Sequence, residues 1–242
     1  MAIYIGTSGW SYNHWTGVLY PEGLPVERRL DAYISRFRTV ELNASYYRWP
    51  SDAAFASWRR RLPSDFLLTV KAPGALTHVK RLYSPEQWLQ RIKGGLSRLG
   101  PNRGVLLVQL PPSATIDEPR LAYFLGRLPP ALKVAVELRN ASWNTESIFE
   151  LLERHGAAYC VMSGARLPCI LRATAPFVYV RLHGPDAQSL YAGSYSDDDL
   201  RWWSDRIREW DGGGRDVFVY FNNDGEGNAV RNALTLTRLV AP

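Results

Sequence analysis

The sequence predicts an α/β fold, a single-domain TIM-like (β/α)8 barrel, because strand-like and helix-like runs alternate about eight times along its 242 residues. The strand-like runs tend to end in polar side chains on one face, as the inward-facing groups of a barrel site do. A doubly wound open sheet is the alternative, but residues 6–10 (GTSGW) lack the G-x-G-x-x-G loop of its nucleotide-binding form. Because no linker or low-complexity tract interrupts the chain, we expect one domain over residues 1–242.

The strand predictions rest on short apolar runs bounded by turn residues or by a helix-like run. In chain order they cover residues 3–7, 39–43, 66–71, 105–110, 133–138, 158–162, 177–182 and 216–221. Pro111 and Pro112 close the fourth run, since proline cannot continue a central strand. Regular alternation of such runs with helices predicts a parallel sheet.

The helix predictions rest on apolar spacing and on start and stop signals. They cover residues 26–37, 52–62, 85–99, 118–127, 145–155, 197–210 and 227–239. Proline stands in the first turn of the third helix, and Gly156 ends the fifth. The return segment after the sixth strand, residues 166–175, is short and contains Pro168, so we expect an irregular or stunted sixth helix.

The bulk composition is that of an ordinary globular protein with a modest excess of positive charge. There are 29 basic and 23 acidic residues, a net charge of +6, which favours anionic partners. No apolar run reaches the roughly 18–20 residues that cross a bilayer, and the chain opens directly into a strand. We therefore expect a cytoplasmic protein without membrane contact. Cys160 and Cys169 have neither disulfide nor zinc spacing, and Cys160 is expected to be a buried thiol.

Two carboxylates lie on the predicted strands, Glu41 and Glu137, and strand alternation places both inside the barrel. Burying a carboxylate is costly unless it is paired, and burial shifts its pKa. Lys71, Arg139 and Arg181 come from other strands and can pair with these acids. Two interpretations stay open, a buried ion-pair network that stabilises the barrel and a general acid–base pair or substrate clamp.

His183 ends the seventh strand on the interior face, so among four histidines it is the best candidate for proton transfer. His78 follows the third strand and can face the same mouth, whereas His155 ends a helix. The arginine fork fits phosphate or carboxylate with two hydrogen bonds. We therefore expect Glu41, Glu137 and His183 to be catalytic, with an anion clamp formed by Lys71, Arg139 and Arg181.

Aromatic residues crowd the loops that follow several predicted strands, all at one end of the barrel. They are Trp10, Tyr12, Trp15, Tyr20, Tyr46, Tyr47, Trp49, Trp143, Tyr191 and Tyr195. Such residues either plug the mouth as a second small core or stack on a base, a sugar or another flat ligand. We expect Trp10, Tyr47 and Tyr191 to wall in the substrate, and Asn43, Gln109 and Asn222 to orient it.

Motifs spread in order over nearly the whole chain resemble one known family. They include Gly6-Thr7-Ser8-Gly9-Trp10, Val40-Glu41-Leu42-Asn43, Gln109-Leu110-Pro111-Pro112, Glu137-Leu138-Arg139, Arg181-Leu182-His183-Gly184 and Phe221-Asn222-Asn223. The chain is thereby similar to the YecE-like family, known as domain of unknown function 72. The resemblance implies a TIM-like barrel distantly similar to the endonuclease IV and xylose isomerase barrels, and it implies no settled reaction. Asn140 stands where the resemblance leads us to expect histidine.

Three classes of function follow from these residues. The favoured one is a metal-independent enzyme without a cofactor, a hydrolase or lyase, that acts on an anionic ligand such as a phosphate-bearing nucleotide or nucleic-acid component. The second is a non-catalytic nucleic-acid-binding protein, and the third is a metal-dependent phosphodiesterase. The expected partner is accordingly an anionic small molecule or nucleic acid, and the oligomeric state stays open.

Overall fold

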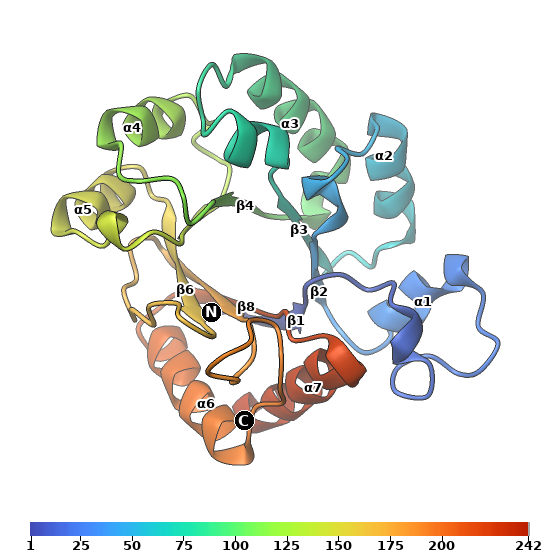
Figure 1. Ribbon diagram of the computed structural model, residues 1–242. Coiled ribbons are helices and arrows are strands. Elements are labelled where there is room, and N and C mark those ends of the chain that lie inside the picture. Colours follow the sequence, from blue (N-terminus) through green and yellow to red (C-terminus); the bar gives the residue numbers. More distant parts are fainter. Residues whose placement is uncertain (242) are drawn as a thin grey trace. The chain divides into compact units, whose positions relative to one another are not determined.

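A computed structural model describes residues 1–241, in which eight strands follow the predicted order. The strands are β1 (Ile3–Thr7), β2 (Thr39–Leu42), β3 (Leu67–Lys71), β4 (Arg103–Leu110), β5 (Val134–Leu138), β6 (Ala158–Ser163), β7 (Phe177–Leu182) and β8 (Asp216–Phe221). Their order in the sheet is β1-β8-β7-β6-β5-β4-β3-β2, and a parallel bridge between Ser8 and Glu41 links the end of β1 to β2. This parallel order, with helices between the strands, is that of a TIM-like (β/α)8 barrel, as predicted (Figure 1).

Seven α-helices follow the strands in the described chain, each where a helix was predicted. They are α1 (Arg29–Ile34), α2 (Asp52–Arg61), α3 (Glu86–Leu99), α4 (Glu118–Gly126), α5 (Glu146–Arg154), α6 (Asp197–Gly212) and α7 (Asn228–Val240). No helix forms between β6 and β7, which confirms the irregular sixth position. The first helix is shorter than predicted, because residues 26–28 form a separate 3-10 turn before it.

Contacts divide the chain into two compact units. The first comprises residues 1–41, 161–171 and the chain from Pro176 onward. Here β1 and β7 both pair with β8, and Val180 and Ile5 lie at the level of Val219. α6 and α7 pack against each other and against this part of the sheet (Figure 1). Ser196 starts α6 with a reciprocal capping box to Asp199, which satisfies backbone groups at the helix start.

The second unit comprises residues 42–160 and 172–175. Its β4 contains a run of fully buried apolar side chains, as expected for a parallel strand covered on both faces. The register pairs Gln109 with Glu137, so these two side chains lie on one face at the strand ends. α2 packs closely on α3, because a Cβ on Gly95 would lie only 2.5 Å from the Phe55 ring.

Membrane-crossing character is absent from the helices. Within residues 1–241, none of them combines the length and the apolar composition that a bilayer span requires.

Candidate functional site

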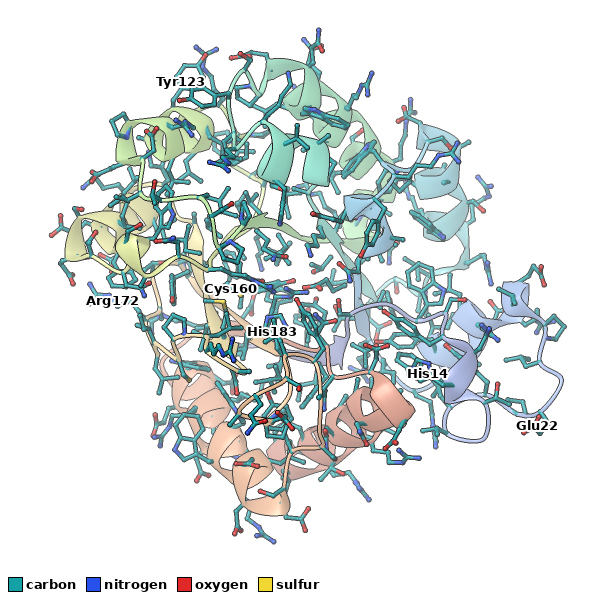
Figure 2. The ribbon with its side chains drawn as sticks, in the orientation of Figure 1. His14, Glu22, Tyr123, Cys160, Arg172 and His183 are labelled. Atoms are coloured by element: carbon teal, nitrogen blue, oxygen red, sulfur yellow. The ribbon has the colours of Figure 1, made fainter. Side chains whose placement is uncertain are left out.

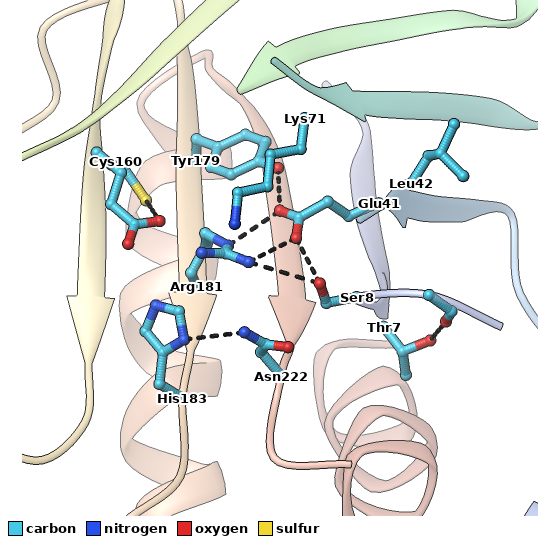
Figure 3. Close-up of polar contacts among 12 residues, drawn as sticks. Thr7, Ser8, Glu41, Leu42, Lys71, Cys160, Tyr179, Arg181, His183 and Asn222 are labelled. Atoms are coloured by element: carbon cyan, nitrogen blue, oxygen red, sulfur yellow. Dashed lines mark hydrogen bonds and ion pairs between the residues drawn. The ribbon is translucent and has the colours of Figure 1, made fainter. Parts of the chain in front are cut away.

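The interior of the first unit is organised around a fully buried ion pair between Glu41 and Arg181. Arg181 Nη2 lies 2.7 Å from Glu41 Oε1, and Arg181 Nε donates to Glu41 Oε2 at 3.0 Å (Figure 3). Both side chains have an exposed fraction of 0%. Bidentate contact of this kind is the strong form of an arginine–carboxylate interaction.

Two hydroxyl groups complete the surroundings of Glu41. Ser8 Oγ donates to Oε1 and Tyr179 Oη donates to Oε2, each at 2.6 Å (Figure 3). Burial, and then the Glu41 charge, raise the pKa of Tyr179 well above its ordinary value, so its hydroxyl keeps the proton that it donates. Glu41 therefore accepts four hydrogen bonds, an arrangement typical of a carboxylate with a structural role. Its catalytic role stays a prediction.

Tyr179 was not among the site residues predicted from the sequence, although it contacts Glu41 in the structure. The signal was present, because Tyr179 and Arg181 are two positions apart on β7 and therefore share one face of the strand.

His183 directly follows the last residue of β7 and is fully buried. Asn222 Nδ2 contacts its Nδ1 at 3.2 Å (Figure 3). An amide nitrogen can only donate, so Nδ1 is the acceptor and a neutral ring carries its proton on Nε2. The Tyr191 ring packs edge-on with its centroid 5.3 Å from that of His183. The structure thus brings together three predicted site residues of this unit.

A network of buried amides fastens the loop that covers His183, residues 184–195. Asn232 Oδ1 accepts from Tyr195 N at 3.2 Å and from Asn223 Nδ2 at 3.0 Å. Tyr195 Oη in turn accepts from Gly184 N at 3.0 Å. Tyr191 has the left-handed φ of 71°, which is uncommon for a bulky residue. The position of the Tyr191 ring therefore depends on this loop being held.

In the second unit, Glu137 and Arg139 pair at the end of β5. Arg139 Nε donates to Glu137 Oε1 at 2.6 Å, with side-chain exposed fractions of 9% and 0%. The thiol of Cys160, buried as expected, lies 4.0 Å from Glu137 Oε2. Glu137 thus orients the guanidinium of Arg139.

Lys71 and His78 approach the same group of charges. Lys71 Nζ lies 4.7 Å from the centre of the Tyr46 ring, a cation–π contact, and the His78 ring packs edge-on against the same tyrosine. Thr77 Oγ1 and His78 Nδ1 are 2.9 Å apart, which fixes the imidazole. Burial, and then the charges of Lys71 and Arg139, lower the pKa of His78 below its ordinary 6.5, opposed by Glu137. We call Lys71, His78, Glu137 and Arg139 the basic cluster.

Two predicted substrate-orienting amides have buried oxygens in this unit. Gln109 is 5% exposed, and its Oε1 meets no hydrogen-bond donor among the described residues. Asn43 Oδ1 is likewise buried and meets no hydrogen-bond donor among the described residues. Buried polar atoms are usually satisfied, so such an acceptor is a candidate contact for a ligand donor.

The aromatic residues divide between core and surface. Trp15 and Tyr20 are at most 2% exposed and pack together in a small core of the first unit, with ring centroids 6.1 Å apart, and Trp143 is equally buried in the second unit. The carbonyl of Trp10 accepts from the Tyr20 hydroxyl, which ties Trp10 to that core. Tyr47, in contrast, is 83% exposed and packs edge-on against Tyr46. Whether Trp10 and Tyr47 wall a substrate stays a prediction.

Metal-binding side chains do not gather within residues 1–241. No group of three or more histidine, cysteine, aspartate or glutamate side chains is placed to hold an ion there.

Comparison with known proteins decides the family. A model of the family described as "Protein of unknown function DUF72" matches residues 4–242. The chain belongs to this family. It is 29% identical to UPF0759 protein YunF of Bacillus subtilis, over 98% of this chain and 94% of that protein. UPF0759 protein YecE of Escherichia coli is 30% identical over 57% of this chain and 48% of its own length.

Solved structures agree with the family and the fold. A DUF72 family protein from Thermotoga maritima superposes with a TM-score of 0.89 at 31% identity, covering 99% of both chains. D-psicose 3-epimerase from Clostridium cellulolyticum, solved with D-tagatose, superposes with a TM-score of 0.57 at 12% identity, covering 99% of this chain and 98% of its own. The second likeness supports the barrel fold alone.

Proposed function

We propose that this chain is an enzyme that acts on an anionic, phosphate-bearing ligand by acid–base chemistry at the carboxyl ends of β3, β4 and β5. The observation that carries the proposal is the basic cluster. Lys71 and Arg139 lie close enough to His78 to lower its pKa, and Arg139 pairs with the carboxylate of Glu137. With His78 neutral the cluster has a surplus of one positive charge, in surroundings where Lys71 is only 8% exposed. Such a charge in a low-dielectric place attracts an anion.

The two cations would have different roles. Arg139 is held by Glu137 through Nε, so its planar fork is positioned in advance for an oxyanion. Lys71 is a compact charge on a flexible stem, and Tyr46 restrains it by the cation–π contact. Together they would bind the anionic group and stabilise negative charge that develops during the reaction.

His78 would transfer the proton in this unit. Its lowered pKa keeps the ring neutral at pH 7, the state that accepts a proton, and Thr77 fixes the ring direction. Gln109 Oε1 offers an acceptor on the same strand-end face as Glu137. This favours a ligand with a hydroxyl or N–H donor beside its anionic group, as sugar phosphates and nucleotides have.

The residues of the first unit enter the proposal in a different way. The contacts of Glu41 with Arg181, Ser8 and Tyr179 favour a structural role for that pair over substrate binding. His183, held by Asn222 and covered by Tyr191, remains a proposed proton-transfer group of its own unit.

The test measures binding first and turnover second. Wild type, Lys71→Gln and Arg91→Gln are screened by thermal shift against sugar phosphates, mononucleotides and short oligonucleotides at two salt concentrations. Arg91 stacks over Trp88 on α3 and is not in the basic cluster, so Arg91→Gln is a control for the same change in net charge. A ligand that binds the folded state raises the melting temperature by mass action.

We expect a phosphate-bearing compound to stabilise wild type and Arg91→Gln, to lose roughly tenfold in affinity with Lys71→Gln, and to be turned over. His78→Gln should then abolish turnover while binding survives. Binding without any turnover would refute the enzyme and support the non-catalytic alternative. Equal weakening in Arg91→Gln would show general charge attraction and no site.

A further inference from the structure

We infer that a second pocket, formed by the loops after β3 and β4 and the start of α4, binds a small flat carboxylate. The cavity has a volume of about 230 Å³, enough for a single-ring ligand. Its lining combines an apolar floor with two guanidinium groups, and it includes no residue of the basic cluster. The inference therefore stands apart from the proposed function.

The floor of the pocket is apolar and firmly held. Leu121 and Leu110 are at most 2% exposed, and the Trp143 indole is equally buried. Trp143 Nε1 donates to the carbonyl of Ala114 at 2.7 Å, which fixes the plane of the indole. Ile116, 39% exposed, adds an apolar wall near the opening. A flat apolar ring would fill this floor by burying its area against the indole and the aliphatic groups.

The rim carries charge of the opposite sign to a carboxylate. Arg81 and Arg120 line the pocket together with Asp117, a sum of one positive charge. Arg120 pairs with Asp117 and stacks with its guanidinium carbon 3.5 Å from the centre of the Tyr83 ring. Its Nε is buried and meets no acceptor among the described residues. A monoanion would neutralise the rim, whereas a phosphate dianion would leave excess negative charge beside Asp117.

The wall between these arginines has an unusual backbone. Arg81, Leu82 and Ser84 have φ values of 45°, 67° and 42°, the left-handed region that non-glycine residues rarely adopt. Leu82 is 1% exposed and its N donates to Leu76 O at 3.0 Å, so the surrounding chain holds the segment in place. Such conformations concentrate at ligand-binding positions. Here the segment presents Arg81 and Tyr83 to the pocket.

A more open depression, which shares Arg120 and Tyr83 with this pocket, is a poorer place for an anion. It is lined by Glu86 and Tyr123, whose side chains hydrogen-bond to each other at 2.7 Å. Figure 2 shows Tyr123 at the outer edge of α4. The Glu86 carboxylate would repel a ligand carboxylate. A carboxylate ligand therefore favours the pocket beside Trp143, whose rim has a net positive charge.

The probe is 4-fluorobenzoate, and its binding is measured by ¹⁹F NMR line broadening. Uncharged 4-fluorobenzyl alcohol is the control ligand. Three single variants are compared with wild type. Arg81→Gln removes one rim charge at an exposed side chain, and Ile116→Ala removes part of the apolar wall. Arg127→Gln is the matched control, because Arg127 also stacks on a tyrosine, Tyr123, but does not line the pocket.

We expect the acid to bind wild type more tightly than the alcohol does. Arg81→Gln should weaken the acid roughly tenfold and leave the alcohol unchanged, while Ile116→Ala weakens both about threefold. Arg127→Gln should change neither. Equal broadening of acid and alcohol, or a loss with Arg127→Gln as large as that with Arg81→Gln, would overturn the inference. Circular dichroism of each variant confirms that the fold is retained.

Discussion

Arg181 and Glu41 form a two-bond ion pair whose atoms are entirely removed from solvent, at 2.7 and 3.0 Å. Removing two charges from water is costly, and the mutual attraction offsets that cost only when the remaining hydrogen bonds are also made. Ser8 and Tyr179 make them. These contacts therefore hold the Glu41 carboxylate in one geometry, between Ser8 at the end of β1 and two residues of β7.

Removal of the arginine should be strongly destabilising. Arg181→Met leaves the Glu41 carboxylate buried without its counter-charge, so we expect the free energy of unfolding to fall by about 3–5 kcal/mol. Urea denaturation at pH 7 measures this change. Arg154→Met is the control, because its pair with Glu150 is exposed on α5 and such pairs contribute at most about 1 kcal/mol.

The double variant Glu41→Leu/Arg181→Met sharpens this test. It removes the stranded carboxylate, so we expect part of the lost stability to return. A loss for Arg181→Met no larger than that for Arg154→Met would show that the pair is not buried as described.

Buried tyrosines should make the protein sensitive to alkali. Burial raises the pKa of Tyr195 to about 12, and it also raises the pKa values of Tyr179 and Tyr33 well above the ordinary value. Above pH 10 the unfolded chain releases tyrosine protons that the folded chain keeps, so stability is complete below pH 10 and falls as the pH rises toward 12. Each such tyrosine contributes a slope of about 1.4 kcal/mol per pH unit.

Urea denaturation at several pH values between 9 and 12 measures that slope. Tyr195→Phe should reduce it by the share of one tyrosine, whereas Tyr47→Phe should leave it unchanged, since the Tyr47 ring is 83% exposed when folded. An unchanged slope in Tyr195→Phe would contradict the prediction.

Strand alternation predicted much of this interior from the sequence. It placed Glu41, Arg181 and His183 on inner faces, because side chains of a strand alternate with period two. It did not determine whether the carboxylate and the guanidinium meet, because that depends on strand register and on rotamers, which no local pattern encodes. The choice between an ion-pair network and a substrate clamp was therefore left open.

Loop residues were harder to predict than strand residues. The sequence indicated only that His78 can face the mouth of the barrel. Its place in the basic cluster depends on a single π-helical turn, Ala75–Val79, which the apolar spacing does not predict. The left-handed segment at Arg81 and Leu82 contains no glycine to mark it. Conformations imposed by tertiary packing leave little local signal, and this explains why the pocket beside Trp143 was not foreseen.

The titration of His78 should respond to its neighbours with definite signs. Lys71→Gln removes a positive charge and should raise the His78 pKa toward 6.5, and Arg139→Gln should do the same. Glu137→Gln should lower it further. Because the folded-state pKa is depressed, the associated stability is present above pH 6.5 and is lost as the pH falls through the folded value. NMR titration of the four histidine rings measures these shifts, and a downward shift in Lys71→Gln would refute the arrangement.

Asn232 should control the mobility of the loop over His183. Asn232→Ala leaves the Tyr195 N–H and the Asn223 amide without their shared acceptor, a loss of about 1–3 kcal/mol in local stability. Hydrogen exchange measured by mass spectrometry should then show faster exchange in residues 184–195, with the strands unchanged. Arg238→Ala, exposed on the same helix, is the control. Tyr191 belongs to this loop and its ring packs on His183. The variant should therefore also expose the imidazole of His183. Unchanged exchange in the loop would mean that Asn232 does not fasten it.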